Sequence, residues 1–186
     1  MKPLEEMTLK ELWQLFPIVL EAPDHRWFSW ADEEIRRLRA VLNTIHFTVY
    51  HIGSTAVPNI WAKPIVDLIL EVPDITAFTP VKAKLTEAGY ICMNITDFRM
   101  DFNRGYTPAG FAEKVFHVHV RVKGDTDEIY FRDYLICHPE IAKEYETLKL
   151  SLWKTFEHDR NGYTEAKSDF VRHYTAEAKR VLIRST

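Results

Sequence analysis

Residues 51–72 read HIGSTAVPNIWAKPIVDLILEV, and this stretch decides the fold. It begins at the end of one predicted strand and turns through Gly53 and Ser54. Ile65–Val72 then forms an apolar run of strand length, which predicts a second strand, buried on both faces and central in a sheet. Asp67 lies in the middle of that run. A glycine–serine turn and a carboxylate on the next strand can together hold a phosphate group and a metal ion.

The turn and the buried carboxylate differ in how strongly they indicate a function. Gly53 lets the backbone approach a phosphate, and Ser54 adds a hydroxyl and an N–H, but the same pair is common in an ordinary turn with a serine cap. Asp67 is harder to explain structurally, because a buried carboxylate is costly unless it is paired or binds a metal. Lys63 is close enough in sequence to pair with it. We interpret Asp67 as a catalytic, metal-binding residue, and Gly53 and Ser54 as phosphate-binding residues.

Composition places the chain among globular proteins. Of its 186 residues, 46% are hydrophobic and 27% are charged, which suits one domain with a substantial core. The net charge of −3 gives no overall basic excess, so nucleic acid is not an expected partner. Cys92 and Cys137 predict no disulfide framework, which fits a reducing compartment. The acidic start lacks an export signal and no apolar run reaches the roughly 20 residues of a membrane helix, so we expect a cytoplasmic protein without membrane association.

Apolar spacing and turn residues predict the remaining elements. Strands are expected at 47–52, 65–72, 90–95, 98–106 and 115–122, with a further edge strand at 18–21. Helices are expected at 9–16, 27–45, 75–89, 127–137 and from 139, and a last helix is expected from 164 after a break at Asn161 and Gly162. In the helix from 139, the apolar stripe includes Tyr145 and Leu148.

The last two predicted strands each carry a polar face. Alternation places Asp101 on the polar face of the first, and His117 and His119 on the polar face of the second. We expect these strands to form an antiparallel pair. Two histidines on one strand face can bind a metal or a phosphate, although histidines are also common on a solvated face. Together with His51 and Asp67 they form a candidate acid–histidine cluster.

Basic side chains could bind the phosphate groups of a ligand. Any one of them alone is more often a solvated surface charge. The candidates are Lys63, Lys149 and Lys167 as phosphate-binding residues, with Arg99, Arg104, Arg121 and Arg132 as further basic groups.

Several motifs, in the same order along the chain, resemble a known family. Residues 51–68, HIGSTAVPNIWAKPIVDL, are similar to the signature of the GrpB family, which belongs to the nucleotidyltransferase superfamily with a DNA-polymerase-β-like fold. FHVHV at 116–120 resembles the family's His-x-His strand, and FRDYL at 131–135, with the following His-Pro-Glu, resembles its helical signature. Tyr163 and Lys167 resemble its closing element. Only an N-terminal arm falls outside the resemblance.

The resemblance implies transfer of a nucleoside monophosphate from a nucleoside triphosphate to an acceptor hydroxyl. The glycine–serine turn would hold the triphosphate, and Asp67 would bind a divalent ion, Mg²⁺ or Mn²⁺, with Zn²⁺ as an alternative. Ile69 occupies the position of the superfamily's second carboxylate, and His117 and His119 lie on the strand expected to carry a third. One aspartate with histidines favours a softer ion or a single ion. Asn59 stands where the family has glycine, a change that a left-handed backbone would tolerate.

These features predict an α/β (α+β) fold, in which helices flank a mixed, nucleotidyltransferase-like sheet of about five strands and a helical segment ends the chain. We expect one domain over 1–186, with an arm at 1–16, an α/β core at 17–125 and C-terminal helices at 126–186. The expected ligand is a nucleotide or another phosphorylated small molecule, bound with a divalent metal. Two other functions stay open: a metal-dependent phosphoesterase that uses the acid–histidine cluster, and a catalytically inactive ligand-binding module.

Overall fold

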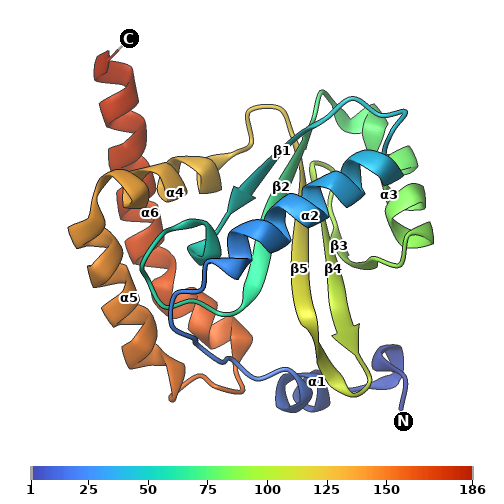
Figure 1. Cartoon of the computed structure of the whole chain (residues 1–186), viewed down its shortest axis with the longest axis horizontal. Helices are drawn as coiled ribbons and strands as arrows, with labels where there is room; N and C mark the ends of the chain where they lie inside the picture. Colours follow the sequence, from blue (N-terminus) through green and yellow to red (C-terminus); the bar gives the residue numbers. More distant parts are fainter. Residues whose placement is uncertain (1, 186) are drawn as a thin grey trace.

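A mixed five-stranded sheet forms the centre of the fold, as the sequence predicts (Figure 1). The computed structural model describes residues 2–185, with side chains as far as residue 181. The strands are β1 (Thr48–Ile52), β2 (Ile65–Val72), β3 (Ile91–Ile95), β4 (Arg99–Thr107) and β5 (Gly110–Val122). Their order in the sheet is β1-β2-β5-β4-β3, in which β2 and β5 are parallel and the other neighbours are antiparallel.

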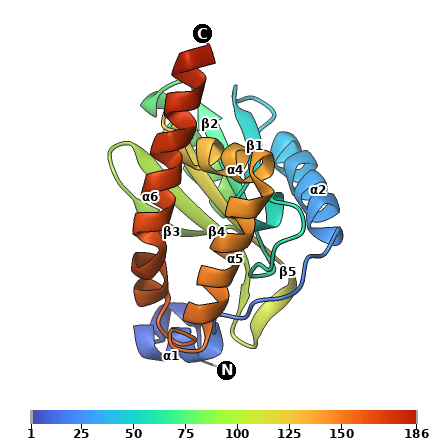
Figure 2. The same cartoon turned by 90° about the vertical axis from the view of Figure 1, so that its left-hand side faces the viewer.

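Helices cover both faces of this sheet. One face packs against α2 (Arg26–Val41) and α3 (Phe78–Glu87). The other face, turned toward the viewer in Figure 2, lies behind α4 (Asp127–Cys137), α5 (Pro139–Trp153) and α6 (Arg160–Ser185). The shorter elements are η1 (Leu4–Glu6), α1 (Leu9–Leu15), η2 (Ser54–Ala56) and η3 (Ile75–Ala77). Within the described residues, every helix is too short or too polar to cross a membrane.

The face of the sheet under α2 and α3 holds the main hydrophobic core. Val66, Leu68 and Leu70 point into it from alternate positions of β2 and are fully buried, together with Val118 and Val120 of β5. Burying each such side chain contributes about 1.5–3 kcal/mol. Because side chains alternate along a strand, the residues between these positions point to the opposite face.

The opposite face carries the polar residues that the sequence predicts there. In the parallel pairing of β2 with β5, Asp67 lies beside His117, and Ile69 lies beside His119. In the antiparallel pairing of β4 with β5, Asp101 lies beside His119. This register brings two carboxylates and two imidazoles onto one surface of the sheet, on the side of α4 and α6.

The predicted break at Asn161 and Gly162 is wrong, because both residues lie in the first turn of α6. Close packing leaves little room for a side chain at the glycine. A Cβ atom at position 162 would lie 2.5 Å from Oδ2 of Asp159. The N–H of Gly162 also donates to Oδ1 of Asp159 at 2.9 Å, which fixes the start of the helix.

Helix α5 is rotated relative to its predicted apolar stripe. Ala142, Tyr145 and Lys149 are buried, whereas Leu148 is only half-buried. The amine of Lys149 is accommodated because it donates to the backbone carbonyl of Trp61. The helix therefore turns a basic side chain inward.

The N-terminal arm joins parts of the fold that are distant in sequence. After α1, Phe16 packs against Tyr106 of β4, with ring centroids 4.7 Å apart. The N–H of Ile18 donates to the carbonyl of Glu157 at 2.7 Å, just before α6. Because this segment bonds to the helical layer, the edge strand expected here is reduced to a single bridge at Glu21.

Candidate metal and phosphate site

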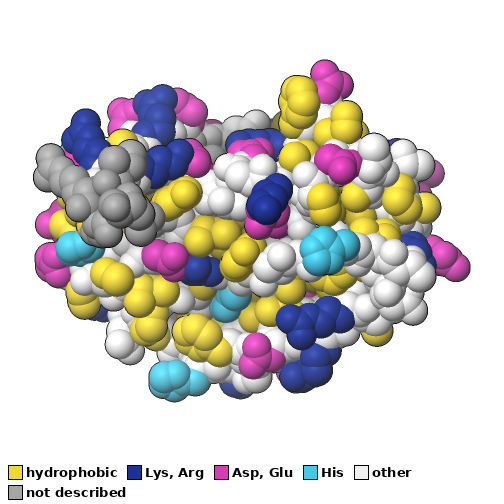
Figure 3. All heavy atoms as spheres, turned by 90° about the horizontal axis from the view of Figure 1, so that it is seen from above, with side chains coloured by type: hydrophobic (Ala, Val, Ile, Leu, Met, Phe, Trp, Pro, Cys, Tyr) yellow, Lys and Arg dark blue, Asp and Glu magenta, His cyan; other side chains and the backbone are white. Residues whose placement is uncertain are grey.

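A cavity of about 900 Å³ lies between the polar face of the sheet and helices α4 and α6. Eight lysine and arginine side chains line it, against three aspartate and glutamate side chains, although the whole chain has a net charge of −3. The lining cations are Lys63, Arg99, Arg132, Lys149, Arg160, Lys167, Arg172 and Lys179. On the face drawn in Figure 3, basic and acidic side chains are interspersed. Four of these cations are paired with carboxylates: Arg99 with Asp125, Arg132 with Asp133, Arg172 with Asp169 and Lys179 with Asp127. The other four, Lys63, Lys149, Arg160 and Lys167, have no ion pair among the described residues, and the low-dielectric walls of the cavity strengthen their attraction for an anion.

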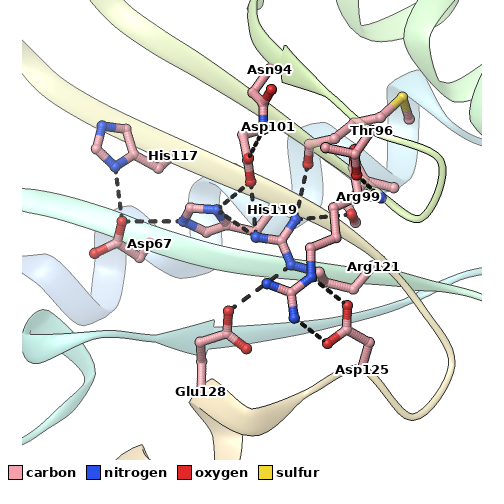
Figure 4. Close-up of polar contacts among 12 residues, drawn as sticks. Asp67, Asn94, Thr96, Arg99, Asp101, His117, His119, Arg121, Asp125 and Glu128 are labelled. Atoms are coloured by element: carbon pink, nitrogen blue, oxygen red, sulfur yellow. Dashed lines mark hydrogen bonds and ion pairs between the residues drawn. The ribbon is translucent and has the colours of Figure 1, made fainter. Parts of the chain in front are cut away.

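Three side chains converge at the sheet wall of this cavity (Figure 4). Nδ1 of His117 lies 2.9 Å from Oδ1 of Asp67, and Nε2 of His119 lies 3.6 Å from the same oxygen. The candidate ligand atoms of these three residues all lie within 4.8 Å of one another. All three line the cavity together with Ser54. The structure thus brings together the residues predicted as metal ligands, which we call the Asp–His–His cluster.

Hydrogen bonds keep Asp67 ionised. Burial alone would raise the pKa of its carboxyl group, but the hydrogen bonds from His117 and His119 outweigh burial and hold that pKa well below its usual range. Burial lowers the pKa of His117 in spite of its bond to Asp67, so the ring is neutral near pH 7. Because a carboxylate only accepts, Nδ1 of His117 carries the proton of this bond.

His119 lies between two carboxylates. Its Nδ1 is 2.8 Å from Oδ1 of Asp101, and its Nε2 faces Asp67. Burial alone would lower the pKa of His119, but the hydrogen bonds with Asp101 and Asp67 raise it to about 9. Arg121 fixes Asp101 through a bond of 2.9 Å and is itself anchored to two backbone carbonyls. A carboxylate on the outer nitrogen is the usual arrangement around metal-binding histidines.

His117 also has a fixed partner on its outer nitrogen. Its Nε2 lies 2.8 Å from the hydroxyl of Tyr106, which accepts a bond of 2.9 Å from Nη2 of Arg160. The rings of Tyr106 and His117 are stacked, with centroids 5.9 Å apart. Each histidine of the cluster therefore presents one nitrogen to Asp67 and keeps the other on a fixed partner.

Gly53 and Ser54 form the turn next to Asp67. Gly53 has a φ of 71° and a ψ of −172°, a conformation that essentially only glycine adopts. Ser54 begins the 3₁₀ helix η2 and lines the cavity. Further along the loop, Asn59 has a φ of 62°, in the left-handed region where asparagine can replace the glycine of the family. The backbone of the motif is therefore held in a conformation that only a few residue types permit.

Three lysines form the basic end of the cavity, of which Lys149 is buried and Lys63 and Lys167 are half-buried. Burial lowers the pKa of Lys63 to about 8, and it lowers the pKa of Lys149 and of Lys167 to about 7. The amine of Lys167 lies 4.3 Å from the ring centroid of Tyr163. The Tyr163 hydroxyl is buried and has no hydrogen-bond partner among the described residues. An anion bound here would favour the charged form of each amine and could accept the bond that Tyr163 leaves unmade.

Two residues predicted near the site lie on the other face of the sheet. His51 points toward Phe28 of α2, and its Nε2 lies 3.0 Å from Oγ1 of Thr55. Arg104 pairs with buried Glu34 of α2, and one of its bonds to that carboxylate is 2.9 Å long. Strand alternation explains both positions, because each residue is one step out of register with the polar face.

Arg132 lines the cavity, but it also holds α4 on the sheet. Its Nη1 donates to the backbone carbonyl of His51 at 2.6 Å, and the guanidinium pairs with Asp133 at 2.7 Å. Much of its bonding capacity is therefore used within the protein.

Asp101, Tyr106 and Arg160 are not among the site residues predicted from the sequence. Asp101 has a usable signal, because pairing the two polar strands in antiparallel register places it beside His119. Tyr106 and Arg160 meet only in the folded chain, since one lies at the end of β4 and the other at the start of α6. No local pattern indicates that contact.

The fold and the cavity define an α+β protein with a candidate site for a metal ion and an anion. The chain belongs to the GrpB family, because the family model described as GrpB protein matches residues 17–177. The UPF0157 protein YqkA of Bacillus subtilis is 33% identical over 160 residues, which cover 84% of this chain and 46% of YqkA. The glutamate-rich protein GrpB of Alkalihalophilus pseudofirmus is 30% identical over 163 residues, which cover 83% of this chain and 91% of that protein.

A solved structure from the same family shares the fold. The crystal structure of the conserved protein GrpB from Enterococcus faecalis aligns with a TM-score of 0.77 and 28% identity, over 88% of this chain and 99% of that one. The predicted sheet with flanking helices and a C-terminal helical segment is thereby confirmed. The chain spans less than half the length of YqkA, 46%, but most of the Enterococcus faecalis protein.

Proposed function

We propose that this protein binds a nucleotide or another phosphorylated small molecule together with one divalent metal ion, and transfers a nucleoside monophosphate to an acceptor hydroxyl group. The observation that carries the proposal is the cavity, in which four basic side chains without an ion pair among the described residues, Lys63, Lys149, Arg160 and Lys167, line the same space as the Asp–His–His cluster. A ligand with several phosphate charges would neutralise these cations. The resemblance of the glycine–serine turn and Asp67 to the nucleotidyltransferase signature supports a nucleotide as that ligand.

The donor atoms of the Asp–His–His cluster fit a metal ion. One carboxylate and two imidazoles converge within 4.8 Å, and the outer nitrogens of both rings are held by Asp101 and Tyr106. One oxygen and two nitrogen donors suit Zn²⁺ better than Mg²⁺ or Mn²⁺, which prefer oxygen donors. When bound, such an ion would stabilise negative charge on the phosphoryl oxygens.

The surroundings of the cluster support one ion rather than two. Ile69, at the position of the superfamily's second carboxylate, is fully buried. The nearest further carboxylate, Asp101, is already neutralised by the Arg121 guanidinium at 2.9 Å and by His119. We therefore propose a site for a single ion.

The remaining residues of the cavity would bind and orient the ligand. Lys63, Lys149 and Lys167 would donate charge-assisted hydrogen bonds to phosphate oxygens, and Ser54 would add its hydroxyl and N–H. Lys149 is buried and held by the carbonyl of Trp61, and the other groups are half-buried, so their charges would be screened less by water than at an exposed surface. Transfer would join the acceptor oxygen to the α-phosphorus and release pyrophosphate.

A metal-dependent phosphoesterase is the second candidate. The donor set favours it, since one carboxylate and two histidines commonly hold a single hydrolytic ion, and water would then replace the acceptor hydroxyl. A ligand-binding module without turnover would use the same cavity and the same basic residues.

Calorimetric titration of metal-stripped protein distinguishes these functions. Zn²⁺, Mn²⁺ and Mg²⁺ are titrated singly, and nucleoside triphosphates are then titrated with each ion. We expect nucleotide binding that strengthens with the ion, and loss of ion binding in Asp67→Asn. Asp74→Asn is the matched control, because Asp74 caps η3 and does not line the cavity.

The outcomes separate clearly. No nucleotide binding with any ion would exclude the nucleotide hypothesis. Hydrolysis without an acceptor, lost in Asp67→Asn but kept in Asp74→Asn, would favour the phosphoesterase. Tight binding without turnover, across a broad set of acceptors, would favour the ligand-binding module.

A further inference from the structure

One hydroxyl group joins the two parts of the proposed site. The hydroxyl of Tyr106 lies 2.8 Å from Nε2 of His117 and accepts a bond of 2.9 Å from Nη2 of Arg160. His117 belongs to the Asp–His–His cluster, and Arg160 lines the basic end of the cavity close to Lys63. Phe16 packs on the Tyr106 ring and holds it in place.

A phenol suits this position because its hydroxyl both donates and accepts. In the ligand-free protein, Nδ1 of His117 donates to Asp67, so Nε2 accepts from the Tyr106 O–H. When Nδ1 is instead a metal ligand, the proton of the neutral ring lies on Nε2, which then donates to the Tyr106 oxygen. That oxygen can accept from His117 and from Arg160 at the same time. Phenylalanine has no hydroxyl group, so it could bond to His117 neither in the ligand-free protein nor when His117 is a metal ligand.

We propose that Tyr106 is a positioning residue that orients His117 and Arg160 together, so that metal binding and anion binding strengthen each other. This inference rests on the proposed function, because it takes His117 as a metal ligand. The bond from Nε2 is stronger when the imidazole is a metal ligand, since the N–H is then more polarised. The same oxygen keeps Arg160 aimed along the cavity wall, where an anion would meet it.

The effect of Tyr106 can be tested with two matched tyrosine variants. Tyr106→Phe removes the shared hydroxyl. Tyr90→Phe is the control, because Tyr90 is buried and, like Tyr106, bonds to a charged group, Glu34 at 2.5 Å, but on the opposite face of the sheet. Zn²⁺ and sulfate are the probes, each titrated alone and in the presence of the other. Thermal unfolding of each variant checks that the fold is retained.

Tyr106→Phe should bind Zn²⁺ about 10–100-fold more weakly, the usual effect of removing a partner of a metal-binding histidine. The factor by which sulfate strengthens Zn²⁺ binding should also fall. Tyr90→Phe should keep both wild-type values. Arg160→Lys offers a second route, because it retains the charge but loses the planar group that reaches Tyr106, so the same factor should fall with little change in Zn²⁺ affinity.

Wild-type Zn²⁺ affinity in folded Tyr106→Phe would overturn the inference and leave the proposed function standing. An unchanged sulfate effect in Arg160→Lys would also overturn it. Failure of the wild-type protein to bind Zn²⁺ would overturn the inference together with the proposed metal site.

Discussion

Gly53 and Asp67 lie so close together that only glycine fits at position 53. A Cβ atom there would lie 2.6 Å from Oδ2 of Asp67 and 3.2 Å from its Cβ. The turn proposed to bind phosphate and the carboxylate proposed to bind metal are therefore packed as one unit. Gly53 serves this unit through its missing side chain as well as through its backbone conformation.

Gly53→Ala should lower the free energy of unfolding by roughly 3–5 kcal/mol, because backbone strain and overpacking act together. Gly89→Ala is the matched control, since Gly89 also has a positive φ, 86°, but a Cβ there would meet nothing within 4 Å. That control should lose only about 1–2 kcal/mol. Urea denaturation measures both variants. If both variants lost the same free energy of unfolding, the contact between position 53 and Asp67 would make no contribution to stability.

Ile69→Asp should destabilise the protein instead of creating a second metal-binding carboxylate. Ile69 is fully buried, so the new charge would lie without water, at a cost of about 3–5 kcal/mol. Ile69→Val, which keeps the position apolar, should cost about 0.5–1.5 kcal/mol. Chemical denaturation and Zn²⁺ titration check both points. A stable Ile69→Asp variant that binds Zn²⁺ more tightly would contradict the single-ion proposal.

Arg104→Met should reduce stability without affecting ligand binding. Glu34 is 1% exposed and depends on Arg104 for charge compensation, so removing the guanidinium should cost about 3–5 kcal/mol. The double variant with Glu34→Gln should recover part of this loss, because the unpaired charge is then gone. Denaturation curves of the single and double variants measure the effect. A change in sulfate or Zn²⁺ affinity of folded Arg104→Met would mean that the two faces of the sheet are coupled.

Sulfate binding should weaken as the pH rises from 6 to 9. The pKa of Lys149 and of Lys167 is about 7 and the pKa of Lys63 is about 8, so these amines are cationic at the lower pH and mostly neutral at the higher one. Sulfate keeps its charge over this range, so the change reports the protein. Lys167→Met should flatten the profile, whereas Lys82→Met, on an exposed position of α3, should not. Calorimetry at several pH values gives the affinities, and a profile that is flat in the wild type would rule out these lysines as the anion site.

Much of the fold could be predicted because the strands alternate so regularly. The apolar positions of β2 and the valines of β5 indicate which face of each strand is buried, and the pairing of these two strands places Asp67, His117 and His119 on one side. Helix orientation was harder to predict. Lys149 turns inward because its partner is the carbonyl of Trp61, a contact between residues far apart in the chain.

The site was only partly predictable, because some of its contacts also join residues that are far apart in the chain. The face on which each side chain lies follows from local pattern, so the three cluster residues could be named as candidates. His51 and Arg104 are basic residues on suitable strands, but each lies one position out of step with the cavity. The contact between Tyr106 and Arg160 joins a hairpin to a helix start, and only the packing of the helical layer on the sheet creates it.

Helix α6 runs along the length of the cavity, which it lines from Arg160 to Lys179. At a rise of 1.5 Å per residue these positions span about 28 Å. Lys167, Val171, Thr175 and Lys179 follow one another at intervals of about one turn on the cavity side, with Arg172 and Ala176 beside them, so the chemistry of the wall changes along the helix. Successive turns of α6 therefore present different chemical groups to successive positions along the cavity. If one lining residue is substituted in each turn, the change in ligand affinity would show which part of a bound ligand lies beside that turn.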